Sequence, residues 1–312
     1  MPCYYPLDGY RSKSPNENGN FYVVFDPKSG QKDAPMSVAC GRCIGGRLER
    51  SRQWAIRCVH EAQQHDASSF ITLTYAEESI PHDHSLDKKH FQTFMKRLRK
   101  RLHPKKIRYY MCGEYGTEQD PFSPNHLGRP HYHAIIFGYD FPDKEAISTG
   151  KHGDVLYTSP LLEKTWTNGN HWIGEMTFES AAYVARYCTK KINGDQAEEH
   201  YRRIDPATGE QFELEPEYGS QSNHPGIAAD WFKKYRHDMD KGFITANGVK
   251  MPAPDYYHKL YARDHYEDYE PIKQKALQSI DPDDPEYSIK RLRVKEALKL
   301  KKINDLNKRN QQ

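Results

Sequence analysis

The sequence predicts an α+β fold in which an antiparallel sheet carries helices on one face. Segments rich in β-branched and aromatic residues, some of them alternating in polarity, have the pattern of strands. Amphipathic segments lie between them, and their apolar residues recur at helical spacing. The resulting order, β-α-β-β-(α)-β-α, is typical of a ferredoxin-like (RRM-like) arrangement.

Each element has a local reason. Residues 1 to about 40 are rich in turn formers, so we expect an irregular segment with one short strand at 21–25. An apolar stripe from Phe91 to Leu102 predicts a helix, which Pro104 ends. The elements predicted after the first segment are helices over 47–64, 86–103, 159–166 and 180–192, and strands over 70–75, 107–113, 131–138, 154–158 and 171–178.

Composition and charge restrict the class of protein. The 312 residues are 36% hydrophobic, 29% charged and 12% aromatic, which suits a modest folded core and excludes a disordered chain. No apolar run reaches the length of a membrane span and the N-terminus lacks a signal-peptide core, so we expect a cytoplasmic protein without a membrane partner. The net charge is only +3, but residues 88–108 hold ten lysines and arginines and no acidic residue. Such a segment attracts a phosphate backbone.

The strand and helix pattern weakens beyond Gly194. Helices are predicted there over 228–237 and 287–310, and the second is basic with little apolar face. That composition favours a solvated tail over a folded element that contacts DNA. We therefore expect one domain over 1–250, with its core at about 66–194, and a charged, partly helical extension over 251–312.

Two histidines in one predicted strand form the first candidate site. His131 and His133 lie two residues apart, so their side chains share one face of the strand while Tyr132 points to the other. Two imidazoles at this spacing can hold one divalent ion, and an oxygen as third ligand leaves positions open for phosphate and water. Glu114, at the end of the preceding strand, is the best candidate for that oxygen. Taken alone, the motif fits two surface histidines equally well.

Two tyrosines in a predicted helix form the second candidate site. Tyr183 and Tyr187 are four residues apart and share one helical face, with Lys190 three residues further along it. A tyrosine hydroxyl can attack a phosphodiester and form a phosphotyrosine, while a metal ion stabilises charge on the non-bridging oxygens. A Tyr-x-x-x-Tyr pair by itself is more often aromatic packing against a sheet.

Together these motifs resemble the HUH superfamily of rolling-circle replication initiators. More narrowly, the chain resembles the replication initiators of the gokushoviruses, small icosahedral single-stranded DNA phages. The resemblance covers nearly the whole chain to about Tyr261, and it makes 1–250 an HUH endonuclease domain with catalytic tyrosines on a helix. The family's three motifs correspond to 70–75, 131–133 and 183–190, and further similar segments are 45–55, 91–100, 112–116, 128–133 and 177–187.

The resemblance implies a function. The protein would cut one strand of single-stranded DNA at the viral replication origin, stay joined to the 5′ phosphate through tyrosine, and leave a free 3′ hydroxyl. Tyr183 and Tyr187 would alternate as nucleophiles, so that joined circular genomes are released. The cofactor would be Mg²⁺ or Mn²⁺, held by the two histidines and Glu114. Host replication proteins (helicase and polymerase) would be partners, in the cytoplasm of the infected bacterial host.

The resemblance also suggests roles for other residues. Lys190 would stabilise charge near the phosphate, and Thr72 and Thr74 would position the DNA. The remaining predicted DNA contacts are basic residues of the helix over 86–103 and of the segment after the tyrosines: Lys96, Arg97, Arg99, Lys100, Arg101 and Lys191.

A pair of cysteines suggests a second metal. Cys40 and Cys43 have the spacing of a zinc knuckle, and Cys3 or His60 could complete a tetrahedron around a structural zinc ion. The family that the chain resembles often has a further cysteine where this chain has Gly46. Because that ligand is missing, a tight turn with free thiols is the favoured interpretation.

Three other functions stay open at this point. A plasmid relaxase or a transposase could use the same chemistry, although paired tyrosines favour replication over single-tyrosine transposases. A non-catalytic origin-binding protein would hold single-stranded DNA with the sheet, the basic helix and the aromatics, without a covalent adduct. A zinc hydrolase built on His131, His133 and Glu114 would stay active after both tyrosines were changed to phenylalanine.

Overall fold

The computed structural model describes residues 3–17, 21–116, 128–150, 153–187, 191, 196–204, 208–279, 281 and 284–310. The chain divides into two compact units. Residues 51–272 form the larger unit, and residues 1–50 together with 273–312 form the smaller one. The expected functional division at residue 250 stays a prediction.

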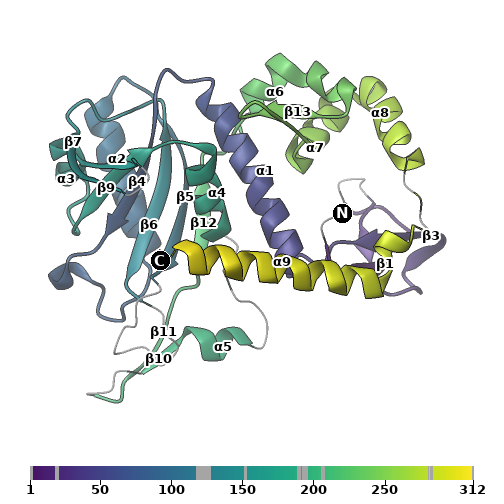
Figure 1. Ribbon diagram of the computed structural model, residues 1–312, viewed down its shortest axis with the longest axis horizontal. Helices are drawn as coiled ribbons and strands as arrows, with labels where there is room; N and C mark the ends of the chain where they lie inside the picture. The colour runs from purple at the N-terminus through teal and green to yellow at the C-terminus, as the bar shows by residue number, and fades with distance from the viewer. Residues whose placement is uncertain are drawn as a thin grey trace. The chain divides into compact units, whose positions relative to one another are not determined.

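A seven-stranded sheet forms the centre of the larger unit, and all its strand pairs are antiparallel (Figure 1). The predicted α+β class and the predicted strands of the core are therefore confirmed. The strand β7 was not predicted because all its side chains are exposed, which removes the alternation that marks a strand. In spatial order the strands are β12 (Tyr218–Gln221), β5 (Arg108–Tyr115), β6 (Pro130–Phe137), β4 (Ser68–Thr74), β9 (His171–Glu175), β8 (Val155–Thr158) and β7 (Glu145–Thr149).

The remaining elements of the larger unit are helices and short strand pairs. Among the described residues, no helix combines the length and the apolar character that crossing a membrane requires. The helices are α1 (Ile44–Ala62, whose first turns belong to the smaller unit), α2 (Lys88–Leu102), α3 (Pro160–Thr165), α4 (Phe178–Tyr187), α5 (Gln196–Tyr201), α6 (Ala229–Tyr235), α7 (Asp255–Asp264) and α8 (Tyr266–Gln278, whose end belongs to the smaller unit). The short strands are β10 (Arg202–Ile204), β11 (Gln211–Glu213), β13 (Ile244–Ala246) and β14 (Val249–Met251).

Helices cover both faces of the large sheet, so the prediction of helices on one face is wrong (Figure 1). Helices α2 and α3 pack against the face that carries Ile71 and Tyr132. Residues 51–62 of α1 pack with α4 against the opposite face, which carries Tyr110 and Ile135. An apolar stripe shows that a helix is buried on one side, but it does not indicate which face of the sheet the helix covers.

Local capping sets the starts of the helices. The Asp87 side chain accepts a hydrogen bond from the Lys89 amide, so α2 begins at Lys88 and buries Phe91 and Phe94. Ser159 caps α3 in the same way, ahead of a proline in its first turn. Both helices lie within the ranges predicted from the sequence, 86–103 and 159–166.

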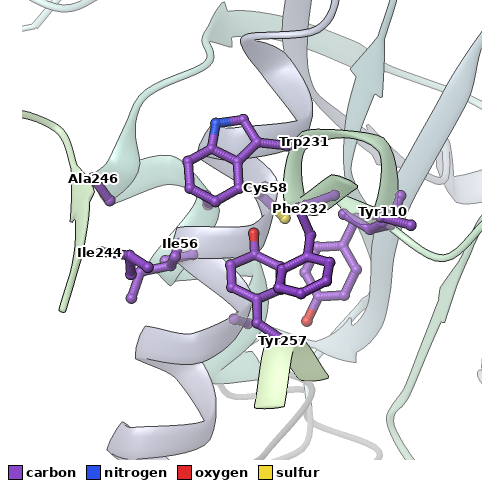
Figure 2. Close-up of a cluster of buried hydrophobic side chains, with 14 of the residues drawn as sticks. Ile56, Cys58, Tyr110, Trp231, Phe232, Ile244, Ala246 and Tyr257 are labelled. Atoms are coloured by element: carbon purple, nitrogen blue, oxygen red, sulfur yellow. The ribbon is translucent and has the colours of Figure 1, made fainter. Parts of the chain in front are cut away.

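Helices α6 and α7 and strand β13 pack with α1 and form an aromatic cluster (Figure 2). Trp231 of α6 and Tyr257 of α7 lie against α1, where the His60 ring stacks on Trp231 at 3.5 Å between centroids. His60 is fully buried, and its ring nitrogens lie 2.8 Å from the Tyr257 hydroxyl and 3.0 Å from the Thr245 carbonyl. Burial lowers the pKa of His60 to about 4. Both nitrogens are engaged, so His60 is not available as a zinc ligand.

The smaller unit contains a three-stranded antiparallel sheet and a C-terminal helix. Its strands are β1 (Leu7–Ser12), β2 (Val23–Val24) and β3 (Gly30–Val38), in the order β2-β1-β3. The prediction of an irregular segment over residues 1 to 40 is therefore wrong, apart from the short strand at 21–25. The predicted basic helix is present as α9 (Ile289–Asn310). Its Arg293 donates to the Tyr4 carbonyl, so this helix contacts the N-terminal segment.

Candidate metal centre and tyrosine helix

Three neighbouring strands carry the predicted metal ligands. In the antiparallel ladder, Glu114 of β5 lies opposite His131 of β6, and Thr72 of β4 lies opposite His133. Because side chains alternate along each strand, all four point to the sheet face that α1 and α4 cover. The sheet register therefore brings the predicted ligands together.

The three ligands form a compact, buried group. The Glu114 carboxylate oxygen Oε1 lies within hydrogen-bond distance of both rings, 2.8 Å from Nε2 of His131 and 3.0 Å from Nε2 of His133. One ligand atom from each residue lies within 4.8 Å of the other two. The side chain of Glu114 is 3% exposed, that of His131 15% and that of His133 7%. This arrangement matches three ligands around one position.

Electrostatics keep the carboxylate in the form that a metal needs. Burial raises the pKa of Glu114, but the hydrogen bonds from His131 and His133 and their charge outweigh that effect, so its pKa lies below the usual value. An ionised carboxylate is the form that binds a cation.

The other ring nitrogens of the histidines orient them. His131 Nδ1 donates to the Arg129 carbonyl at 3.0 Å, because a carbonyl oxygen can only accept. His133 Nδ1 lies 2.9 Å from Thr72 Oγ1. Both contacts leave Nε2 directed at Glu114, which is the arrangement that orients a metal-bound histidine. Two imidazole nitrogens and one carboxylate oxygen fit a divalent ion with further positions open.

Helix α4 places one tyrosine beside this group. Its start is capped reciprocally: the Ser180 amide donates to Thr177 Oγ1, and the Thr177 amide donates to Ser180 Oγ. The half-buried Tyr183 then meets the His133 ring edge to face, with centroids 5.0 Å apart, and the Phe70 ring at 6.2 Å. The residues that fasten α4 to the sheet are buried and apolar: Ala181, Val184 and Ala185.

The other predicted residues have different positions. Tyr187 is the last residue of α4, one helical turn after Tyr183, while Lys190 lies outside the described residues. Lys191 is exposed. Thr74 lies opposite His131 in the ladder and, by alternation, on the same face as Thr72.

The basic residues of α2 are separate from the three predicted metal ligands Glu114, His131 and His133, called the metal group below. All are exposed, and their helix packs on the sheet face opposite to the one that carries the histidines. The structure therefore does not bring them to the candidate site, and a DNA-contacting role for them stays a proposal. The residues concerned are Lys96, Arg97, Arg99, Lys100 and Arg101.

Two groups that contact the ligand histidines were not predicted from the sequence. The Phe70 ring stacks on the His133 ring at 5.7 Å, and the Arg129 carbonyl orients His131. Alternation along the predicted strand puts Phe70 on the same face as Thr72, so this aromatic residue could have been predicted. The carbonyl contact depends on backbone geometry, for which the sequence carries no signal.

Comparison with known proteins places the chain among replication-associated proteins. The model of a family described as replication-associated protein ORF2/G2P matches residues 68–192, a range that contains the metal group and both tyrosines. No solved structure matches.

Three relatives narrow the assignment. The replication-associated protein VP4 of Bdellovibrio phage phiMH2K is 31% identical over 255 residues, which are 78% of this chain and 74% of the relative. The replication-associated protein ORF2 of Spiroplasma virus 4 is 29% identical over 86% of this chain and 83% of its own length. The replication-associated protein ORF4 of Chlamydia phage 1 is 30% identical over 77% of this chain and 57% of its own length. The chain belongs to the gokushovirus replication initiators, as its resemblance to that family indicated.

Proposed function

We propose that this chain nicks single-stranded DNA at the viral replication origin through a tyrosine nucleophile and later joins the strand again. The observation that supports this most directly is the edge-to-face contact of Tyr183 with His133, which belongs to the metal-binding group. A tyrosine that served only as packing would have no need of a buried His-Glu-His group beside it. The family's part in replication agrees with this proposal.

The residues of the site have distinct tasks in this proposal. Glu114, His131 and His133 would hold a divalent ion, Mg²⁺ or Mn²⁺. When bound, the ion supplies positive charge that stabilises the non-bridging oxygens of the scissile phosphate. The Phe70 and His133 rings hold the Tyr183 ring at the edge of the group. Thr72 keeps His133 in its ligating orientation.

The chemistry is a transesterification. The Tyr183 oxygen loses its proton and bonds to phosphorus, and the bond from phosphorus to the 3′ oxygen breaks. The 3′ oxygen takes up a proton, and the 5′ phosphate stays on the tyrosine. Joining is the reverse: a 3′ hydroxyl attacks the phosphotyrosine and the tyrosine leaves. One phosphoester replaces another in each direction, so no external energy source is needed.

The remaining assignments extend the same proposal. Tyr187 would attack the regenerated origin while Tyr183 still carries the first strand, and Lys190 would stabilise the phosphate charge. Thr74, Lys191 and the basic residues of α2 would contact DNA. Host helicase and polymerase would use the free 3′ end, in the cytoplasm of the infected bacterium.

The test is cleavage of a labelled single-stranded origin oligonucleotide with Mn²⁺, followed by denaturing electrophoresis. We expect an SDS-resistant protein–DNA adduct with the unaltered chain and with the control Tyr235→Phe, which removes a partly exposed hydroxyl in α6. The adduct should disappear in His131→Ala and in the double variant Tyr183→Phe, Tyr187→Phe. Because the Tyr183 ring contacts His133, its single variant should lose most of the first nick.

Two outcomes would reject the proposal. Tight origin binding with neither adduct nor cleavage would favour a non-catalytic origin-binding protein. Cleavage that persists in the double tyrosine variant would favour a metal-dependent hydrolase whose tyrosines are structural.

A further inference from the structure

Three cysteines of the smaller unit meet at one point. Cys3 Sγ lies 3.5 Å from Cys40 Sγ and 3.8 Å from Cys43 Sγ, and the three sulfurs lie within 4.8 Å of one another. Two sulfurs bound to one tetrahedral zinc ion, each at about 2.3 Å from it, are about 3.8 Å apart. The spacing of the three thiols is therefore that of ligands around one ion.

Backbone amides point at all three sulfurs. The Cys40 amide donates to Cys3 Sγ at 3.2 Å, and the Cys43 amide donates to Cys40 Sγ at 3.4 Å. Cys43 Sγ accepts from the amides of Tyr4 and Gly46, each at 3.4 Å. Each sulfur thus accepts at least one backbone donor.

The smaller unit has little else to hold it together. Among its described residues, the buried apolar side chains are Cys3, Cys43 and Leu292, and two of these belong to the thiol group. Aromatic residues of its sheet region are exposed, including Tyr22 at 52% and Phe25 at 57%. A small unit that cannot build an apolar core commonly depends on a structural metal.

We propose that Cys3, Cys40 and Cys43 bind a structural zinc ion, separate from the ion of the His-Glu-His group. Soft thiolates select Zn²⁺ over Mg²⁺ or Mn²⁺, and binding releases the three thiol protons without any redox step. A water molecule takes the fourth position. This site is independent of the proposed nicking activity, because it lies in the other compact unit.

Gly46 offers a test by gain of a ligand. A Cβ atom added there would lie 3.8 Å from Cys43 Sγ and 3.8 Å from Gly41 Cα, which are ordinary van der Waals distances. Gly46→Cys therefore has room for a fourth thiolate beside the other three. With Co²⁺ in place of zinc, the sulfur-to-cobalt charge-transfer band should become stronger in this variant than in the unaltered chain.

The main experiment measures zinc by mass spectrometry in the full-length chain carrying His131→Ala, which disables the other metal group. We expect one zinc ion per chain, its loss in Cys3→Ser and in Cys40→Ser, and its retention in the control Cys58→Ala, whose thiol lies in the core of the larger unit. Absence of zinc, or its retention in both serine variants, would overturn the proposal. So would a Cys3–Cys40 disulfide in protein purified under reducing conditions, or a cobalt band that Gly46→Cys does not change.

Discussion

Replacing Thr72 by valine tests how the metal group is oriented. The substitution keeps the shape of the side chain and removes the hydroxyl that lies 2.9 Å from His133 Nδ1. A metal at Nε2 requires the proton on Nδ1, and in the variant that N–H would face a methyl group. An unsatisfied buried donor costs about 1–3 kcal/mol. Loss of such an orienting partner lowers metal affinity by about 10–100-fold.

The assay is a titration of nicking rate against Mn²⁺, with calorimetric metal binding as a second measurement. Thr72→Val should shift the Mn²⁺ midpoint by about 10–100-fold and recover most of the rate at saturating metal. Thr74→Val is the matched control for metal binding, because it makes the same change on the same strand face, at a side chain for which the structure describes no hydrogen bond to a ligand histidine. Since Thr74 is itself proposed to contact DNA, its Mn²⁺ midpoint, and not its nicking rate, should equal that of the unaltered chain. An unchanged midpoint, or a rate that excess Mn²⁺ does not restore, would refute the orienting role.

Three further predictions concern stability and DNA binding. The pKa of His60 is about 4 in the folded chain and about 6.5 when unfolded, so its neutral form contributes about 3 kcal/mol above pH 6.5. That contribution should be lost as the pH falls from about 6.5 to about 4, and urea unfolding should show a weaker pH dependence in His60→Gln. Gly169→Ala should lower the free energy of unfolding by more than about 3 kcal/mol, because its Cβ would lie 2.1 Å from a backbone nitrogen at a φ of +149°. If α2 contacts DNA, Lys96→Ala with Lys100→Ala should reduce the slope of log affinity against log salt by about 1.4.

Matched variants separate these effects from general damage. Gly153→Ala also sits at positive φ, +86°, but its Cβ would meet no atom of the described residues within 4 Å, so it should cost only about 1–2 kcal/mol. Equal losses at both glycines would contradict the steric argument. The exposed pair Lys233 and Lys234 in α6 serves as the charge control, and equal slopes for both lysine pairs would remove α2 from the DNA-binding surface.

The metal group could be predicted because its geometry is mostly local. Two-residue spacing assigns His131 and His133 to one face of a strand, and Glu114 lies next to the last residue of the strand that precedes them in the chain. The tyrosine helix followed from its own spacing. What the sequence lacked was the pairing register, which decides that Glu114 lies opposite His131.

The three-stranded sheet of the smaller unit could not be predicted as a whole, because little of it is buried. Strand β3 contains Pro35 and few apolar residues, so its pairing with β1 leaves no alternation to detect. Cys3 was one of two residues expected to complete the cysteine pair, but it lies 37 positions before Cys40, so no spacing motif could choose it over His60. The packing of helices likewise depends on contacts between distant segments. Helix α1, for example, packs against α6 and α7, which follow it far along the chain.

The ladder of β4, β5 and β6 has a consequence for how this protein can change in length. Adding or deleting one residue within β6, ahead of His131, would turn both imidazoles toward the α2 face and bring Tyr132 to the metal face. The chain can therefore gain or lose residues in the connections between these strands, but inserting or deleting one residue inside β6 displaces both histidine ligands at once.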